Sequence, residues 1–300
     1  MTGPPGLVAA CPAKINLSLR VVGRRPDGFH ELDTVFQTID LWDHLELRPG
    51  TDLRLRCNDA SVPIDGRNLV LRAAELVRDR ADRPCGGATI DLCKSIPAQA
   101  GLGGGSSDAA GALRLFAEYW DVHLSDTDIV DLACRLGADV PFFLTGGTAR
   151  GTGRGDQIVS LRPAGPLPIV LGLAPFGVST AEAFGALGAE LTLDSNGVRF
   201  RPVFAHKWQE DNDFSLLTND FERVVFPRWP ELARFRDALL VSGARHAMLS
   251  GSGSTVYGVF ADPQQAKRAA RDLEARHAGW RVVATRAIDA SAHVVRQARR

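Results

Sequence analysis

A run of four glycines and two serines between Pro97 and Asp108 carries most of the chemical information in this chain. The glycines are Gly101, Gly103, Gly104 and Gly105, and they are followed directly by Ser106 and Ser107. Glycine has no Cβ, so the backbone N–H groups of such a loop can come close to a ligand. Apolar residues at helical spacing follow, namely Ala109, Leu113, Phe116 and Trp120, and they predict a helix whose N-terminus attracts anions. We expect a phosphate-binding loop with Ser106 or Ser107 as the N-cap. No Walker A lysine follows the glycines, and a flexible turn before a helix is the alternative.

Two further polar groups could take part in chemistry. Lys14 and Asn16 alternate with Ile15 and Leu17, which is typical of a strand with both polar side chains on one face. That face is either solvated or functional. Asp139 lies after a predicted helix end in an apolar neighbourhood, where we expect the following proline to hold Val140 extended. A carboxylate there needs a partner, and Lys14 would be a suitable one. A purely structural ion pair is the alternative.

The elements that must position these residues follow from local patterns. Strands are expected over residues 15–21, 32–47, 53–57, 88–93, 168–173, 247–249, 255–260 and 281–286. Helices are expected over residues 68–80, from Ser125 to Gly137, over 231–240 and from Asp262 to about His277. Residues 145–168 are rich in Gly and Pro and are the expected interdomain region. A loop of small residues at 250–254 is a second place of close backbone approach, or a simple hairpin turn. We expect the tail Arg296–Arg300 to be frayed.

Composition excludes several classes of protein. Lys and Arg together number 35, as do Asp and Glu, so no bulk charge favours nucleic acid. No stretch reaches the length needed to cross a membrane, and the first residues lack a secretory signal. The five cysteines show no Cys-x-x-Cys spacing, which argues against zinc and disulfides and favours a cytoplasmic location.

Taken together, the motifs resemble a superfamily of small-molecule kinases that includes galactokinase, homoserine kinase, mevalonate kinase and phosphomevalonate kinase. Three motifs match in order, at residues 12–16, 97–107 and 249–253. Within that superfamily, residues 13–17, 25–32, 137–142 and 219–222 resemble the family of 4-diphosphocytidyl-2-C-methyl-D-erythritol kinases. The resemblance implies an α+β fold of two domains with the active site in the cleft between them. We expect an ATP-binding and catalytic domain at residues 1–160 and a substrate-side α/β domain at 161–300.

The resemblance also implies an activity, namely transfer of the ATP γ-phosphoryl group to the 2-hydroxyl of 4-diphosphocytidyl-2-C-methyl-D-erythritol in the non-mevalonate isoprenoid pathway. Lys14 and Asp139 would be the catalytic pair, and Asn16 would hold the substrate. Phe29, His30 and Phe184 would bind the cytosine, although Phe29 stands where the family usually has Tyr. The ATP phosphates would be wrapped by Pro97, Ala98, Gln99, Ala100, Gly101, Leu102, Gly103, Gly104, Gly105, Ser106 and Ser107, with Mg²⁺ close to Ser107. Asn68 and Lys94 are plausible neighbours of the adenine. A monomer or a weak homodimer is expected.

Two rival functions remain open at the level of sequence. Another kinase of the superfamily, acting on homoserine, mevalonate or a sugar, would have no use for the aromatic residue at Phe29. A nucleotide-binding regulator or RNA-contacting module without catalysis is disfavoured by the neutral charge and by the presence of both Lys14 and Asp139.

Overall fold

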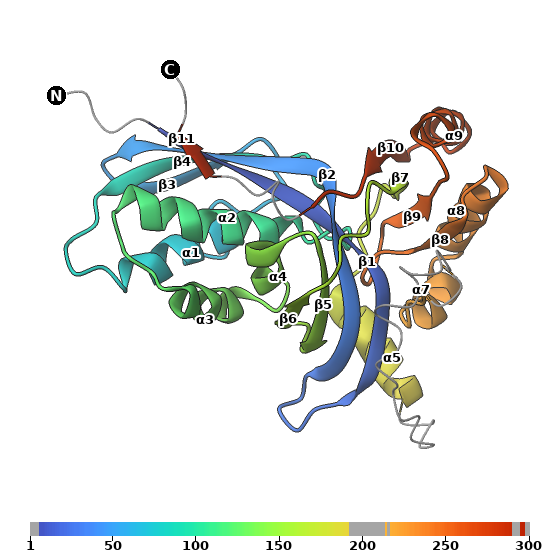
Figure 1. Ribbon diagram of the computed structural model, residues 1–300, viewed down its shortest axis with the longest axis horizontal. Coiled ribbons are helices and arrows are strands. Elements are labelled where there is room, and N and C mark those ends of the chain that lie inside the picture. Colours follow the sequence, from blue (N-terminus) through green and yellow to red (C-terminus); the bar gives the residue numbers. More distant parts are fainter. Residues whose placement is uncertain (1–5, 192–213, 215–216, 290–294, 298–300) are drawn as a thin grey trace.

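A long antiparallel hairpin, formed by β1 (Leu7–Arg24) and β2 (His30–Gly50), runs through the centre of the molecule (Figure 1). The computed structural model describes residues 6–191, 214, 217–289 and 295–297. One half of β2 pairs with β4 and the other half with β5, so this strand joins two parts of one sheet. The hairpin therefore pairs with β4 towards one of its ends and with β5 towards the other.

Among the described residues the first sheet has seven strands. Five follow the order β11-β1-β2-β4-β3, β5 pairs with β2, and β6 pairs with β5. Of these described strands, only β3 and β4 pair in parallel. Its remaining strands are β3 (Leu53–Cys57), β4 (Gly87–Cys93), β5 (Thr148–Gly153), β6 (Gln157–Ser160) and β11 (Val295–Gln297). Four helices cover one face of it (Figure 1), namely α1 (Leu69–Arg78), α2 (Gly104–Tyr119), α3 (Asp126–Leu136) and α4 (Val140–Thr145).

A second, antiparallel sheet has the order β10-β7-β9-β8. Its strands are β7 (Pro168–Leu173), β8 (His246–Leu249), β9 (Val256–Val259) and β10 (Arg281–Arg286). The helices of this half are α5 (Thr180–Leu191), α7 (Glu222–Arg228), α8 (Pro230–Val241) and α9 (Pro263–Arg276). The chain passes from one sheet to the other between Ser160 and Pro168, and the division into two domains stays a prediction.

Three apolar clusters fill the interior. One lies between the first sheet and α1–α4, and a second lies between the second sheet and its helices. The third joins the two sheets and contains Ile15 and Leu17 of β1 together with Leu171 of β7 and Tyr257 of β9. Because one face of β1 packs against the second sheet, Lys14 and Asn16 are directed to the opposite face.

Several sequence expectations were wrong in detail. α2 begins at Gly104, and its N-cap is Gly103 in the left-handed conformation, without a side-chain capping bond; neither Ser106 nor Ser107 is the cap. Val140 is the first residue of α4 rather than extended, because Pro141 is tolerated in a first helical turn. Arg296 and Gln297 are not frayed, since they belong to β11, which pairs with residues 7–9 of β1; residues 298–300 of the expected tail lie outside the described residues. Residues 145–160 are not a linker, because β5 and β6 belong to the first sheet.

Candidate active site

Lys14 and Asp139 face one another, as their sequence context predicted. The Lys14 Nζ lies 3.5 Å from Asp139 Oδ2. Lys14 comes from the middle of β1 and is only 3% exposed, whereas the Asp139 side chain at the start of α4 remains 35% exposed. No side-chain capping bond ties Asp139 to α4. A buried cation therefore faces an accessible carboxylate, and that carboxylate can accept a proton from a bound molecule.

Asn16 holds the Lys14 ammonium in place. Lys14 Nζ donates to Asn16 Oδ1 at 2.7 Å, and Asn16 Nδ2 donates to Thr34 Oγ1 at 2.8 Å. The Thr34 hydroxyl donates in turn to the carbonyl of Ser18 at 2.7 Å. This chain of donors and acceptors sets the orientation of the Asn16 amide, so its oxygen is directed at the lysine. The polar face of β1 is thus a buried network and not a solvated surface.

The glycine loop lies beside this network. Lys14 N–H donates to the carbonyl of Leu102 at 2.9 Å, and the first helical hydrogen bond of α2 runs from Ser107 N–H to Gly103 O at 2.9 Å. The N–H groups of residues 104–106 precede that bond and have no carbonyl within the helix to bind. Gly103 has a φ of +68°, and a Cβ there would lie 3.0 Å from Lys14 Cγ. Glycine at 103 therefore lets the helix N-terminus approach the lysine.

The loop at residues 250–254 closes the site from the second sheet. Ser250 Oγ donates to the carbonyl of Gly101 at 2.9 Å, and Thr255 N–H donates to that of Ala100 at 3.1 Å. Asn219 Nδ2 donates to the carbonyls of Leu249 and Gly251 at 2.9 and 2.8 Å. The loop is a hairpin connection between β8 and β9, and it is also the second close backbone approach that the sequence suggested.

A cavity of about 300 Å³ collects these groups. Of the predicted residues it is lined by Lys14, Asn16, Asp139, Phe184, 97–101 and 103–106. Gly251 and Ser252 of the 250–254 loop also line it, as do Thr34 and Thr180, which the sequence reasoning did not single out. Thr180 and Ser252 share a hydrogen bond of 2.9 Å. The small-residue composition of the 250–254 loop was a signal for two of them, whereas Thr34 and Thr180 carry no local signal.

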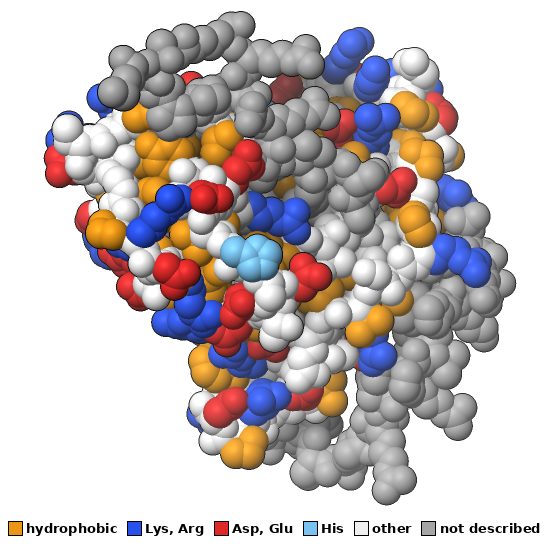
Figure 2. Space-filling model, turned by 60° about the vertical axis from the view of Figure 1, so that its left-hand side comes forward, with side chains coloured by type: hydrophobic (Ala, Val, Ile, Leu, Met, Phe, Trp, Pro, Cys, Tyr) orange, Lys and Arg blue, Asp and Glu red, His pale blue; other side chains and the backbone are white. Residues whose placement is uncertain are grey.

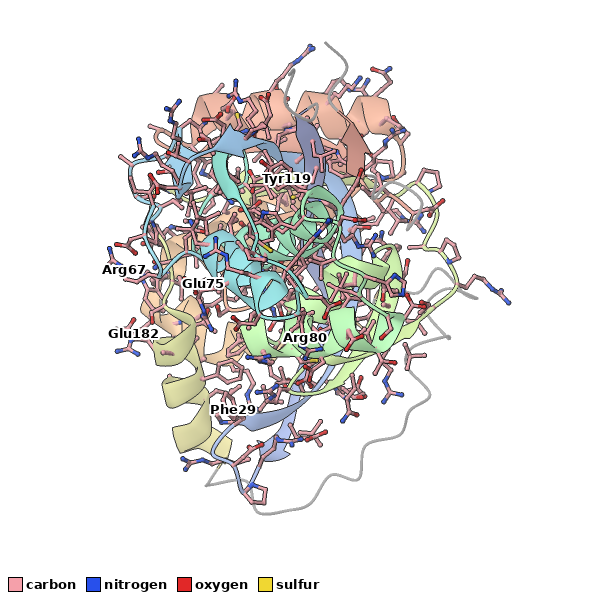
Figure 3. All side chains as sticks on the ribbon, turned by 90° about the vertical axis from the view of Figure 1, so that its left-hand side faces the viewer. Phe29, Arg67, Glu75, Arg80, Tyr119 and Glu182 are labelled. Atoms are coloured by element: carbon pink, nitrogen blue, oxygen red, sulfur yellow. The ribbon has the colours of Figure 1, made fainter. Side chains whose placement is uncertain are left out.

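The residues expected at the cytosine are only partly together. His30 stacks on Phe184 with 4.8 Å between ring centroids and an interplanar angle of 18°. Partial burial, together with the nearby Arg24, lowers the pKa of His30. Phe29 is 54% exposed on the turn between β1 and β2 (Figure 3), and the Arg154 guanidinium lies 5.2 Å from its ring centroid. His30 thus occupies the stacking face of Phe184.

Four other predicted residues, Leu102, Asn68, Lys94 and Ser107, do not line the cavity, and neither do Phe29 and His30. Asn68 caps α1, since its Oδ1 accepts from Val70 N–H and its Nδ2 donates to Pro63 O. The Lys94 side chain is 6% exposed and is enclosed by two carboxylates. Ser107 is 1% exposed, and its hydroxyl has no hydrogen-bond partner among the described residues.

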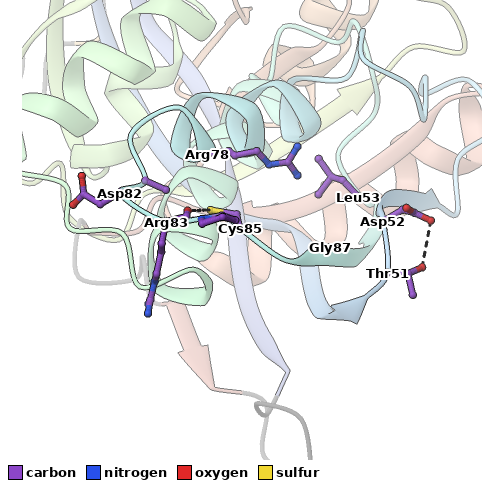
Figure 4. Close-up of a pocket in the computed structure, with 10 residues that line it drawn as sticks. Thr51, Asp52, Leu53, Arg78, Asp82, Arg83, Cys85 and Gly87 are labelled. Carbon is purple, nitrogen blue, oxygen red and sulfur yellow. Dashed lines mark hydrogen bonds between the residues drawn. The ribbon is translucent and has the colours of Figure 1, made fainter.

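A larger, open groove of about 680 Å³ lies elsewhere on the first half of the chain (Figure 4). It is lined by Thr51, Asp52, Leu53, Arg78, Ala81, Asp82, Arg83, Pro84, Cys85 and Gly87. None of the predicted site residues is among them, and no pair there resembles Lys14 and Asp139. We therefore place the candidate site in the smaller cavity.

All five cysteines are free, and no group of three His, Cys, Asp or Glu in the described part of the chain could hold a metal ion. No helix in that part is long and apolar enough to cross a membrane. Acidic and basic side chains are intermingled on the face that Figure 2 shows, without a continuous patch of either sign.

Comparisons with known proteins give the family of this chain. Residues 68–147 match the family model described as GHMP kinases N terminal domain, and residues 206–279 match GHMP kinases C terminal. A 4-diphosphocytidyl-2-C-methyl-D-erythritol kinase of Pelotomaculum thermopropionicum is 42% identical over 88% of this chain and 92% of its own length. The enzyme of that name from Prosthecochloris aestuarii is 39% identical over 88% and 93%.

Solved structures give the same result. A crystal structure of 4-(cytidine 5′-diphospho)-2C-methyl-D-erythritol kinase superposes with a TM-score of 0.78 at 35% identity, covering 93% of this chain and 98% of that one. A homoserine kinase from Cytophaga hutchinsonii has a TM-score of 0.73 at 16% identity, with 98% of each chain covered, and that likeness concerns the fold alone. The expected α+β kinase fold is confirmed, and the chain belongs to the GHMP kinases and, within them, to the family of the 4-diphosphocytidyl-2-C-methyl-D-erythritol kinases.

Proposed function

We propose that this kinase transfers the γ-phosphoryl group of ATP to the 2-hydroxyl of 4-diphosphocytidyl-2-C-methyl-D-erythritol. The observation that supports it most is the Lys14–Asp139 pair, 3.5 Å apart, in one cavity with the N-terminus of α2. Phosphoryl transfer depends mainly on positioning and on neutralising charge. A helix N-terminus for the phosphates, one ammonium and one accessible carboxylate supply both.

In this proposal Asp139 accepts the proton of the attacking hydroxyl as its oxygen bonds to the γ-phosphorus and the bond to the ADP oxygen breaks. Lys14 orients that hydroxyl and offsets the charge that develops on the phosphoryl oxygens. Asn16 holds Lys14 through the 2.7 Å hydrogen bond and contacts the acceptor. The N–H groups at the start of α2 bind the phosphates.

The metal assignment is part of the same proposal. When bound, Mg²⁺ would neutralise phosphate oxygens of the nucleotide. Ser107 is the protein residue that we assign to it, because its buried hydroxyl has no hydrogen-bond partner in the described structure. Asn68 and Lys94 act, in our proposal, behind the nucleotide site, since their side chains are engaged in protein contacts.

The base would be held at the other end of the cavity. We propose that cytosine takes the place of the His30 ring on Phe184, where the ring centroids are now 4.8 Å apart. A base between two aromatic rings holds them roughly 7 Å apart, so His30 must turn away. It would then hydrogen-bond the polar edge of the base, and Phe29 would cover the second face. We also propose a cytoplasmic enzyme that is a monomer or a weak homodimer.

The test is ADP release with ATP and Mg²⁺, offering the cytidyl substrate beside homoserine, mevalonate and galactose. We expect turnover with the cytidyl substrate alone. Asp139→Asn should lower kcat by about 10²- to 10⁴-fold while ATP binding is retained, and Asp237→Asn, an exposed aspartate on α8, is the matched control. Turnover on another acceptor would refute the substrate assignment, and an active Asp139→Asn variant would remove Asp139 from the mechanism.

A further inference from the structure

Three buried charged side chains lie next to the glycine loop. Lys94 Nζ donates to Asp43 Oδ2 at 2.5 Å and to Asp108 Oδ2 at 2.8 Å. The exposed fractions of these side chains are 6% for Lys94, 0% for Asp43 and 3% for Asp108. We call these three residues the charge cluster. None of them lines the cavity.

The charge cluster joins the two ends of the loop. Asp43 lies on β2, and its Oδ1 accepts the N–H groups of Ser95 at 2.6 Å and Ile96 at 2.9 Å. One carboxylate therefore holds the backbone that enters the loop at Pro97. Lys94 carries the connection to Asp108, which lies on α2, the helix that begins where the loop ends. The entry and the exit of the loop are thus held by one set of contacts.

Lys94 also lies against the first residue of α2. A Cβ built on Gly104 would lie 3.1 Å from Lys94 Nζ and 2.9 Å from Ile96 Cγ2. The residues that enter the loop are therefore packed directly beneath the helix N-terminus that faces the cavity. A shift of Lys94 would move that terminus.

Such a cluster is costly to bury. Two carboxylates share one ammonium, and Asp43 has the better environment because it accepts two N–H groups as well. Asp108 Oδ1 has no hydrogen-bond partner in the described structure. Burial, and repulsion from Asp43, raise the pKa of Asp108 to about 7, against the opposing effect of Lys94. Burial lowers the pKa of Lys94, but the two carboxylates outweigh that effect and raise its pKa above the usual value, so the ammonium stays charged. Apolar side chains of similar volume often stabilise a fold as well as a buried ion cluster does, so stability alone does not account for the charge cluster.

We propose that Asp43, Lys94 and Asp108 are positioning residues for the nucleotide, which set the geometry of the phosphate loop and of the α2 N-terminus without touching the phosphates. This inference rests on the proposed use of the loop for ATP. It assigns Lys94 a role through the loop, in place of direct contact with the adenine. Its direct consequence is that all three side chains should matter for nucleotide binding, including Asp43, which is fully buried on β2.

The experiment measures binding of a non-hydrolysable ATP analogue to Lys94→Met, Asp43→Asn and Asp108→Asn, with Arg83→Met as the control. Arg83 forms an exposed ion pair with Asp121 in the same half of the chain. We expect the three cluster variants to bind the analogue about 10- to 100-fold more weakly, and the control to bind like the wild type. Because the measurement needs no acceptor, it is independent of the proposed substrate.

Two further readouts separate positioning from other roles. The KM for ATP should rise while the KM for the acceptor stays within about twofold, which a general loss of folding would not produce. Combining Lys94→Met with Asp43→Asn should cost less than the sum of the single losses, because both break one network. If only Lys94→Met lost affinity for the ATP analogue, Lys94 would contact the nucleotide directly, and the proposal would be overturned. If Lys94→Met does not fold, the two isosteric Asn variants decide, and wild-type affinity in both refutes it.

Discussion

Substitution of Gly101 by alanine is the sharpest test of how the two halves of the chain meet. Gly101 has a φ of +74°, and a Cβ there would lie 2.0 Å from the carbonyl oxygen of Ser250 and 2.9 Å from that of Gly253. Both atoms belong to the backbone, so no side chain can rotate away. The left-handed conformation costs an L-residue about 1–2 kcal/mol, and overpacking adds about 1–3 kcal/mol. We expect Gly101→Ala to lower the free energy of unfolding by roughly 2–5 kcal/mol.

The same clash should reach the site. The 250–254 loop must move away from Gly101, and that loop contributes Gly251 and Ser252 to the cavity. Displacements of about 1 Å can cost on the order of 10²-fold in rate, so we expect turnover to fall by at least tenfold. Urea denaturation followed by circular dichroism measures the stability, and ADP release measures the rate.

Gly105→Ala is the control for stability alone, because a Cβ there would meet no neighbouring atom within 4 Å, whereas Gly105 lines the cavity and is no control for turnover. It replaces a helical glycine and should stabilise the fold by about 0.5–1 kcal/mol. Wild-type stability and turnover in Gly101→Ala would refute this account of the contact between the loops.

Three other changes test separate parts of the structure. Phe184→Ala should raise the KM for the cytidyl substrate at least tenfold and leave the KM for ATP unchanged. The variant lacks the ring that now stacks on His30 and on which, in our proposal, the cytosine stacks; equal changes in both constants would contradict the assignment. Asn219→Ala should lower the free energy of unfolding by about 2–4 kcal/mol, since the buried carbonyl of Gly251 loses its donor, and an urea titration measures this. Folding raises the pKa of Asp108 to about 7, so this carboxyl binds a proton more tightly in the folded protein than in the unfolded chain. The free energy of unfolding therefore falls as the pH rises from about 4 towards 7 and the folded carboxyl loses its proton. Relative to Asp108→Asn, the wild type should therefore lose up to about 1.4 kcal/mol per pH unit in that range; parallel stability curves for the two proteins would show that Asp108 does not titrate there.

Much of the secondary structure follows from local patterns. Ser125 forms the expected N-cap with a full capping box, and Asp262 caps α9 before Pro263. These signals act within four residues, so a single sequence contains them. The start of α2 was misplaced because it carries no such side-chain signal. Gly103 ends the loop through its own backbone conformation, and no side chain marks that position.

Contacts between distant segments could not be predicted from local patterns. Nothing near Arg296 indicates that it pairs with Val8 across almost the whole chain. The sequence left open whether Asn16 is solvated or buried, because the alternation in β1 shows only that its two faces differ, and its partner Thr34 comes from the neighbouring strand. In the site, residue types suggested the Lys14–Asp139 pair, but the stacking of His30 on Phe184 depends on how α5 packs beside the hairpin.

The glycine loop is held from two directions, and the two supports come from different sheets. From the first sheet, Asp43 binds the backbone that enters the loop. From the second sheet, Ser250 and Thr255 bind the carbonyls of Gly101 and Ala100. Any motion of the second sheet relative to the first must therefore strain or break these two hydrogen bonds, whereas the charge cluster stays intact. Asp43→Asn would therefore weaken nucleotide binding by loosening the support from the first sheet, and Gly101→Ala by loosening the support from the second. Altering contacts between the two sheets should change the effect of Gly101→Ala on nucleotide binding and leave that of Asp43→Asn unchanged.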